Sequence, residues 1–121
     1  GFPSIDGVGY KIGRHDGGET INPDEELREF DESDTADLRQ FIDTYMPQVG
    51  PLKAGKVCKY TMTPDEHFII DFLPQQSNVV VASGFSGHGF KFASAVGEML
   101  AQMVTDGKPQ LSNELFKLNR F

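Results

Sequence analysis

An apolar segment that ends in glycines and continues as a helical pattern constrains the fold of this chain most. Residues 78–83 (Asn-Val-Val-Val-Ala-Ser) lack polar alternation, which is typical of a strand covered on both faces, as in a parallel sheet. Glycines follow at positions 84, 87 and 89, and apolar residues then recur at i, i+3, i+4 and i+7 from Phe92 to Met103. Gly107 and Pro109 end this pattern. The segment therefore predicts a strand, a glycine turn and a helix.

The glycine turn allows two interpretations. Without Cβ atoms, backbone N–H groups can approach a ligand, and the following helix adds about half a positive charge at its N-terminus. A glycine-rich turn also lets a helix pack closely on a sheet, and the spacing 84, 87, 89 does not match the dinucleotide fingerprint G-x-G-x-x-G. From these residues alone, the turn favours a ligand site only slightly.

Composition excludes several classes of function. The chain has 121 residues, enough for a modest core, and 18 acidic against 11 scattered basic residues give a net charge of −7. We therefore expect no nucleic-acid partner. No apolar run reaches the length of a membrane span, and one cysteine cannot form an internal disulfide. Three histidines at positions 15, 67 and 88 give no metal-ligand cluster, so we expect no metal site.

Residues 8–15 alternate with period two, which predicts a strand. Val8, Tyr10 and Ile12 share one face, whereas Gly9, Lys11, Gly13 and His15 share the other. Two glycines beside a lysine suggest a flat object close to that face. The alternative is a solvent-facing edge strand protected by its charges, and the residues alone favour it.

Further elements follow from capping and periodicity. Asn22 and Pro23 indicate the start of a short helix over residues 22–27, and an apolar stripe from Leu38 to Met46 predicts a longer helix ended by Pro47. Strands are expected over residues 56–62 and 67–73, and a loosely packed segment over 111–121. Cys58 shares a face with Tyr60 and Met62 and, as a lone cysteine, is expected to be a small core residue.

Two motifs resemble one known family. Residues 58–71 (Cys-Lys-Tyr-Thr-Met-Thr-Pro-Asp-Glu-His-Phe-Ile-Ile-Asp) and 84–92 (Gly-Phe-Ser-Gly-His-Gly-Phe-Lys-Phe), with residues 1–4, Lys11, Gly13 and His15, are similar to the C-terminal part of the monomeric sarcosine oxidase and N-methyltryptophan oxidase family. The resemblance implies an α+β fold in a truncated, cytoplasmic flavoprotein. It implies antiparallel strands of a substrate-binding domain in residues 1–73, and the final parallel strand and helix of a Rossmann-like FAD-binding domain in residues 74–121.

The function implied by this resemblance is oxidative demethylation of a small N-methyl amino acid, with O2 as acceptor and H2O2 and formaldehyde as products. The FAD would be covalently attached through Cys58. Two alternatives remain: another amine oxidase of the superfamily, of the fructosyl amino acid or glycine oxidase type, and a free-standing, non-catalytic module that binds a partner through its acidic face.

The resemblance also assigns roles to individual residues. Lys11 would assist oxygen reduction, His15 and Tyr60 would line the substrate pocket, and Lys91 would hold the substrate carboxylate. Gly87 would present its carbonyl to the substrate amine. The residues expected at the cofactor are Cys58, Phe85, Gly87, His88, Gly89 and Lys91.

The chain departs from this family in one respect. The G-x-G-x-x-G turn and the early arginine and histidine of the active site are absent from these residues. We therefore expect the isolated chain to bind FAD poorly and to be inactive. Sheet edges left exposed would favour a dimer formed by strand pairing.

Overall fold

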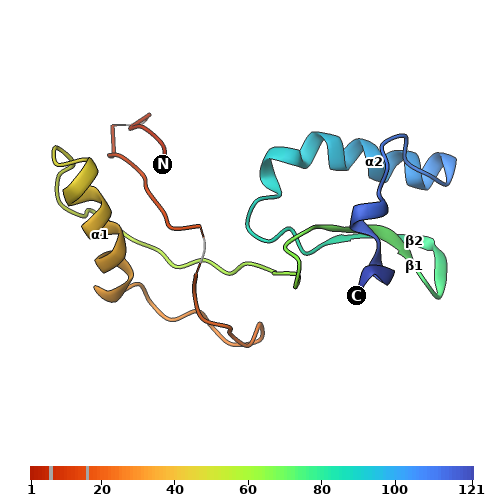
Figure 1. Ribbon diagram of the computed structural model, residues 1–121, viewed down its shortest axis with the longest axis horizontal. Helices are drawn as coiled ribbons and strands as arrows, with labels where there is room; N and C mark the ends of the chain where they lie inside the picture. The colour runs from red at the N-terminus through yellow and green to blue at the C-terminus, as the bar shows by residue number, and fades with distance from the viewer. Residues whose placement is uncertain (6, 16) are drawn as a thin grey trace. The chain divides into compact units, whose positions relative to one another are not determined.

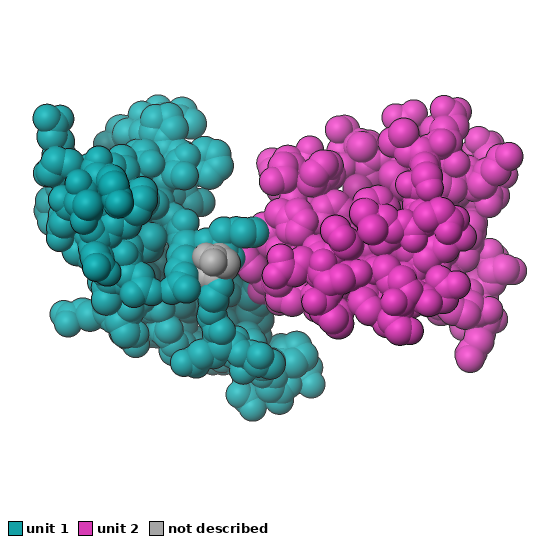
Figure 2. All heavy atoms as spheres, viewed as in Figure 1, with its two compact units in different colours: residues 1–59 teal, residues 60–121 magenta. Residues whose placement is uncertain are grey.

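The structure is a computed structural model of the chain, and it describes residues 1–5, 7–15 and 17–121. The chain divides into two compact units, residues 1–59 (unit 1) and residues 60–121 (unit 2), which Figure 2 shows in different colours. Each unit is described by itself. The border between these units, at residues 59 and 60, is not the domain border expected between residues 73 and 74. The expected border refers to the domains of a complete protein, and it stays a prediction.

Unit 2 contains a β-hairpin made of β1 (Ile69–Leu73) and β2 (Gln76–Ser83). Both expected strands are confirmed, but their pairing is antiparallel, and no parallel strand occurs in the described residues. Pro74 and Gln75 alone connect the strands, and two residues are too few for the crossover that a parallel pair requires. The apolar residues of β2 are half-buried rather than covered on both faces.

A helix covers one face of this hairpin. The short 3₁₀ helix η1 (Phe90–Phe92) leads into α2 (Ala93–Asp106), which ends at Gly107 with a left-handed φ of 76°. Figure 1 shows α2 lying along the hairpin. The predicted apolar stripe is confirmed, because its buried members come from one helix face and join the core. That core comprises Phe68, Ile70, Val96, Met99 and Met103, with Phe72, Val80, Phe85, Leu100 and Phe116 packed against it.

The C-terminal segment is anchored, so the expectation of loose packing is wrong. It forms two short 3₁₀ helices, η2 (Glu114–Phe116) and η3 (Leu118–Arg120). The Asn113 amide donates to the Ile70 carbonyl at 3.0 Å, and the Leu118 N–H donates to the Asp71 carboxylate at 2.9 Å. The Phe116 ring stacks on Phe68 with centroids 5.7 Å apart. These partners lie more than 40 positions earlier, so no local pattern could indicate them.

Unit 1 has one helix, α1 (Ser33–Tyr45), among its described residues, and it confirms the predicted helix. Of its apolar stripe only Ile42 is buried, whereas Phe41 and Tyr45 are exposed. The element order of the whole chain can be followed by colour in Figure 1. None of the described helices is both long and apolar enough to cross a membrane.

Three further elements predicted between residues 8 and 62 are wrong. Residues 8–15 and 56–62 form no strand, and the first region makes only an isolated antiparallel bridge between Phe2 and Lys11. Residues 22–27 form a turn, in which the Asn22 side chain accepts from the Asp24 N–H at 3.1 Å. The alternating pattern requires a neighbouring strand to become a ladder, and the described residues of unit 1 provide none.

Candidate functional site

The glycine turn, residues 84–89, connects β2 to η1 and is the candidate site. Three of its residues have positive φ, namely Gly84 at 62°, Ser86 at 47° and Gly87 at 75°. L-residues with a side chain rarely adopt this conformation, and only glycine adopts it without cost. The turn thus reverses the chain sharply between strand and helix.

Close packing explains each glycine of the turn. A Cβ atom on Gly84 would lie 2.4 Å from the Thr63 side chain, and one on Gly89 would lie 2.5 Å from the Phe85 ring. A Cβ atom on Gly87 would lie 2.3 Å from the Tyr60 ring. The packing interpretation therefore holds for this turn. Gly87 nevertheless remains exposed, beside a Tyr60 ring that is 46% exposed, so its backbone stays accessible to a ligand.

Ser86 fastens the turn to the segment that precedes β1. It is 2% exposed, and its hydroxyl donates to the Gly84 carbonyl at 3.2 Å. The same oxygen accepts from the Thr63 N–H at 3.3 Å, and the Ser86 N–H donates to the Thr61 carbonyl at 3.1 Å. In the described residues no buried side-chain nitrogen or oxygen lacks a hydrogen-bond partner, as a stable turn requires.

Aromatic rings support the turn from the core side. The Phe68 ring is 5% exposed and lies 5.0 Å from the centroids of both Phe85 and His88. The His88 Nδ1 atom lies 3.0 Å from the Ser86 carbonyl oxygen, which fixes the orientation of its ring. Aromatic pairs at such spacings add about 0.5–1.5 kcal/mol beyond the burial of their area.

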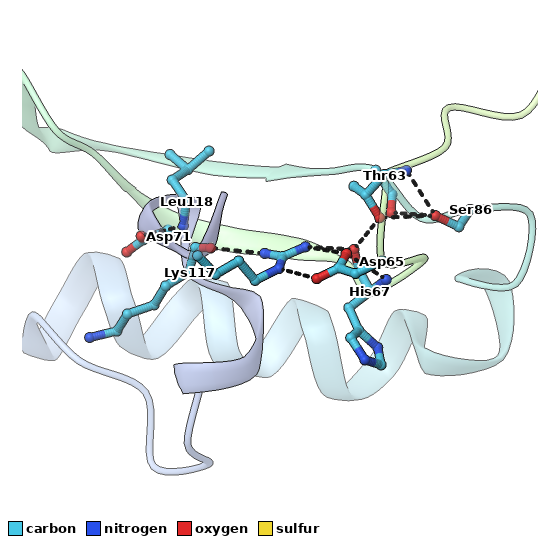
Figure 3. A network of polar contacts seen from close by, with 9 residues as sticks. Thr63, Asp65, His67, Asp71, Ser86, Lys117 and Leu118 are labelled. Carbon is cyan, nitrogen blue, oxygen red and sulfur yellow. Dashed lines mark hydrogen bonds and ion pairs between the residues drawn. The ribbon is translucent and has the colours of Figure 1, made fainter.

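A bidentate ion pair anchors the C-terminal segment to the turn at residues 64–66, which precedes β1. The Arg120 guanidinium donates to the Asp65 carboxylate at 2.7 and 3.1 Å and to the His67 carbonyl at 2.9 Å. The hydrogen bonds from Arg120 hold the pKa of Asp65 well below its usual range, and Asp65 raises the pKa of Arg120. Figure 3 shows the Asp65–His67 region and the Thr63–Ser86 contact in one network.

The predicted site residues fall in both units. Within unit 2, the structure brings together Tyr60, Phe85, Gly87, His88 and Gly89. Lys91 lies in η1 with an exposed side chain, and its ammonium is 5.7 Å from the centroid of the Phe92 ring.

The other three predicted residues, Lys11, His15 and Cys58, belong to unit 1 and are exposed. The Lys11 ammonium lies 5.9 Å from the centroid of the Phe2 ring. The interpretation of Cys58 as a core residue is wrong, because its thiol is free and exposed. No group of three or more acidic, histidine or cysteine side chains that could hold a metal ion occurs in the described ranges.

Sequence reasoning missed four residues that support the turn, namely Thr63, Asp65, Ser86 and Arg120. The positive φ of Ser86 has a weak signal in its position directly before Gly87 and two residues after Gly84. The partnership of Asp65 with Arg120 had no signal, because 55 positions separate them.

Comparison with known proteins shows the family. The family of FAD-dependent oxidoreductases matches residues 2–103, and this chain belongs to it. The chain is 56% identical to a monomeric sarcosine oxidase from Bacillus sp. over 99% of its length and 54% identical to one from Arthrobacter sp.. It is 42% identical to an N-methyl-L-tryptophan oxidase from Citrobacter koseri over its full length. It spans about a third, 32–33%, of these curated relatives.

Proposed function

We propose that this chain is part of an FAD-dependent oxidase that demethylates a small N-methyl amino acid of the sarcosine or N-methyltryptophan type. The products are formaldehyde and H2O2, with O2 as the electron acceptor. The higher identity to sarcosine oxidases, 56% against 42%, favours a sarcosine-type substrate. A cytoplasmic location goes with this proposal and stays a prediction.

The observation that carries the proposal is the exposed backbone of Gly87 beside the exposed Tyr60 ring. Both belong to motifs that resemble the family, and an exposed backbone next to an exposed aromatic ring can bound one side of a planar group. Phe85, His88 and Gly89 lie in the same turn, and the α2 N-terminus that follows η1 favours negative charge on the bound group. These residues therefore fit the role of a cofactor wall.

Cys58 fits the role of a covalent anchor. Its thiol is exposed, as a thioether to a flavin methyl group requires, and it lies two residues before Tyr60 along the chain. The chemistry that FAD supplies when bound is the two-electron oxidation of the substrate C–N bond. The attachment leaves the cofactor unable to dissociate between turnovers.

The remaining residues act on the substrate and on oxygen. The exposed ammonium of Lys91 can pair with the substrate carboxylate, while His15 and Tyr60 would line the pocket around its side chain. The Gly87 carbonyl can accept a hydrogen bond from the substrate amine. The Lys11 ammonium would stabilise negative charge that develops on oxygen as it is reduced.

The test uses the full-length protein that contains this chain. We expect its yellow colour to stay with the protein after acid precipitation, and to wash out in Cys58→Ala. Sarcosine and N-methyltryptophan, supplied separately, should each be assayed for H2O2 release. Colour that washes out of the wild-type protein would exclude the tether, and absence of flavin would exclude the function.

The isolated 121-residue chain provides a second test. It has no G-x-G-x-x-G turn and spans a third of its relatives, so we expect no stoichiometric FAD by absorbance after mixing and gel filtration. The isolated chain is also proposed to dimerise by strand pairing, and its sedimentation would detect the dimer.

A further inference from the structure

A single polar network links the glycine turn to the C-terminal segment. The Ser86 hydroxyl accepts from the Thr63 N–H at 3.3 Å and lies 3.4 Å from the Thr63 hydroxyl, which donates to the His67 carbonyl at 2.8 Å. The Arg120 guanidinium donates to that same carbonyl at 2.9 Å. Figure 3 shows this sequence of contacts from Ser86 through Thr63 to His67. The turn is therefore connected to a residue 34 positions later without any contribution from the strand ladder.

Ser86 is held in a conformation that it would not choose by itself. A φ of 47° is costly for a residue with a Cβ atom, and such strain persists only where surrounding contacts determine it. Its hydroxyl and N–H make those contacts, at 2% exposure, directly before the exposed Gly87. A glycine at this position would adopt the same φ without cost, but it could not make the hydrogen bonds of the Ser86 hydroxyl to Thr63 and Gly84.

We infer that the Ser86 and Thr63 hydroxyls are positioning groups that hold the Gly87–Gly89 backbone in the one conformation that serves the bound cofactor and substrate, and that Arg120 extends this support to the C-terminal segment. This inference rests on the proposed function for its effect on turnover. Both residues are buried, at 7% and 2% exposure for Thr63 and Ser86, so we assign neither hydroxyl a contact with the reacting atoms. Both act through the backbone that they fix.

A positioning group and a group that only stabilises the fold are distinguished by the quantities that their removal changes. A group that only stabilises the fold lowers the melting temperature and the yield of flavoprotein, but each bound flavin then works at its normal rate. A positioning group changes the rate per bound flavin and the absorption spectrum of the flavin when substrate binds, because the groups facing the ring have moved.

The experiment compares matched variants of the full-length protein. Ser86→Ala removes one hydroxyl, and Ser94→Ala removes another from an exposed position of α2. Thr63→Val removes the second hydroxyl while keeping its shape, and Thr63→Ser restores the hydroxyl without the methyl group. Amide hydrogen exchange at residues 87–89 and kcat per bound flavin are measured for each.

We expect amide exchange at residues 87–89 to become about tenfold faster in Ser86→Ala, because the buried Thr63 N–H loses its acceptor, and in Thr63→Val, because the Thr63 side chain no longer binds the His67 carbonyl. The kcat per bound flavin should fall about tenfold in the same two variants. Thr63→Ser should restore both quantities, and Ser94→Ala should match the wild-type protein. Arg120→Met should show the same changes to a smaller degree.

Two results overturn the inference. Exchange that is unchanged in Ser86→Ala shows that the hydroxyl does not hold the turn, and unchanged kcat per flavin shows that it stabilises the fold only. A wild-type protein without flavin overturns the proposed function instead, and the exchange rates then decide whether the two hydroxyls fix the turn.

Discussion

The two units have similar lengths but differ in what holds them. Unit 2 buries five apolar side chains in one cluster, whereas Ile42 is the buried apolar side chain among the described residues of unit 1. Burial of apolar area is the main favourable term in folding, at about 25 cal/mol per Å². Unit 2 therefore has the means to stay ordered by itself, and unit 1 has little.

Charged groups hold unit 1 instead. The Arg28 guanidinium donates to both oxygens of Asp34 at 2.8 and 2.6 Å, and Arg14 pairs with Asp37. Exposed ion pairs of this kind contribute about 0–1 kcal/mol each and weaken as salt rises. A segment with many polar contacts can therefore still lack the buried apolar area that makes folding cooperative.

The largest effect is expected from a substitution in the core of unit 2. Ile70 is fully buried, and Ile70→Ala should cost about 2–5 kcal/mol, which approaches the whole stability of a unit of this size. We expect unit 2 to lose its cooperative thermal unfolding transition in this variant. Circular dichroism measures the transition. Ile42→Ala makes the same chemical change in unit 1 and should leave that transition unaltered. Equal losses from both variants would contradict the difference between the units.

The next largest effect is expected when the C-terminal segment loses its ion pair with Asp65. Arg120→Met removes the partner of Asp65, so the urea midpoint of unit 2 should fall at pH 6. Because Asp65 has a lowered pKa in the folded state, its contribution is present above its unfolded pKa of about 3.9 and is lost as pH falls toward the lower folded value. The gap between variant and wild type should therefore narrow as pH is lowered through 3.

The control for this prediction is Arg39→Met. Arg39 pairs with Asp43 four residues later on the exposed face of α1, and its loss should change the midpoint of unit 2 very little. A gap for Arg120→Met that stays constant from pH 6 to pH 2 would show that the ion pair is not its cause.

A smaller effect is expected at the glycine turn. Gly87→Ala places a methyl group against the Tyr60 ring at a φ of 75°, which costs about 1–2 kcal/mol for the conformation alone. Gly50→Ala in unit 1 has open space around its Cβ atom and no positive φ, so it should be neutral. Urea midpoints of the two variants measure this contrast. A neutral Gly87→Ala would mean that the turn relaxes easily.

The smallest effect concerns the ion pairs of unit 1. Hydrogen bonds from Arg28 lower the pKa of Asp34 to about 2, so Asp34→Asn should remove an interaction that is present above pH 4 and lost as pH falls toward 2. We expect faster amide exchange in the first turn of α1 and no change in unit 2. An NMR titration of Asp34 with a normal pKa would contradict the geometry of this pair.

Local periodicity predicted the elements whose residues pack on one another. The stripe that includes Val96, Met99 and Met103 identified α2, because helical spacing alone places these side chains on one face. The strands before and after Pro74 were predicted from short apolar runs instead. Their antiparallel pairing with each other was not predicted, since an uninterrupted run of valines does not distinguish a hairpin strand from a parallel one, and the membership of β2 in a parallel FAD-binding sheet stays a prediction.

The site was predictable only in part. Motif resemblance assigned Tyr60, Gly87 and His88 to one site. In unit 2 the Tyr60 ring lies against Gly87 and the His88 ring against Phe68, while the roles of these residues stay predictions. Cys58 appeared to be a core residue from its alternating neighbours, but without a paired strand that alternation buries nothing. The contacts of Arg120 and Ser86 depend on residues far away along the chain, so they could not be derived from local patterns.

The β1–β2 hairpin spans the position at which the substrate-binding and cofactor-binding parts are expected to meet. Residues on opposite sides of that position, such as Ile70 and Ala82, are paired across the two strands. A swing of one part against the other cannot be centred on Pro74 and Gln75 without breaking this ladder. Any relative movement of two parts that meet at this position must therefore be centred elsewhere, because the ladder holds the segments on either side of Pro74 and Gln75 together.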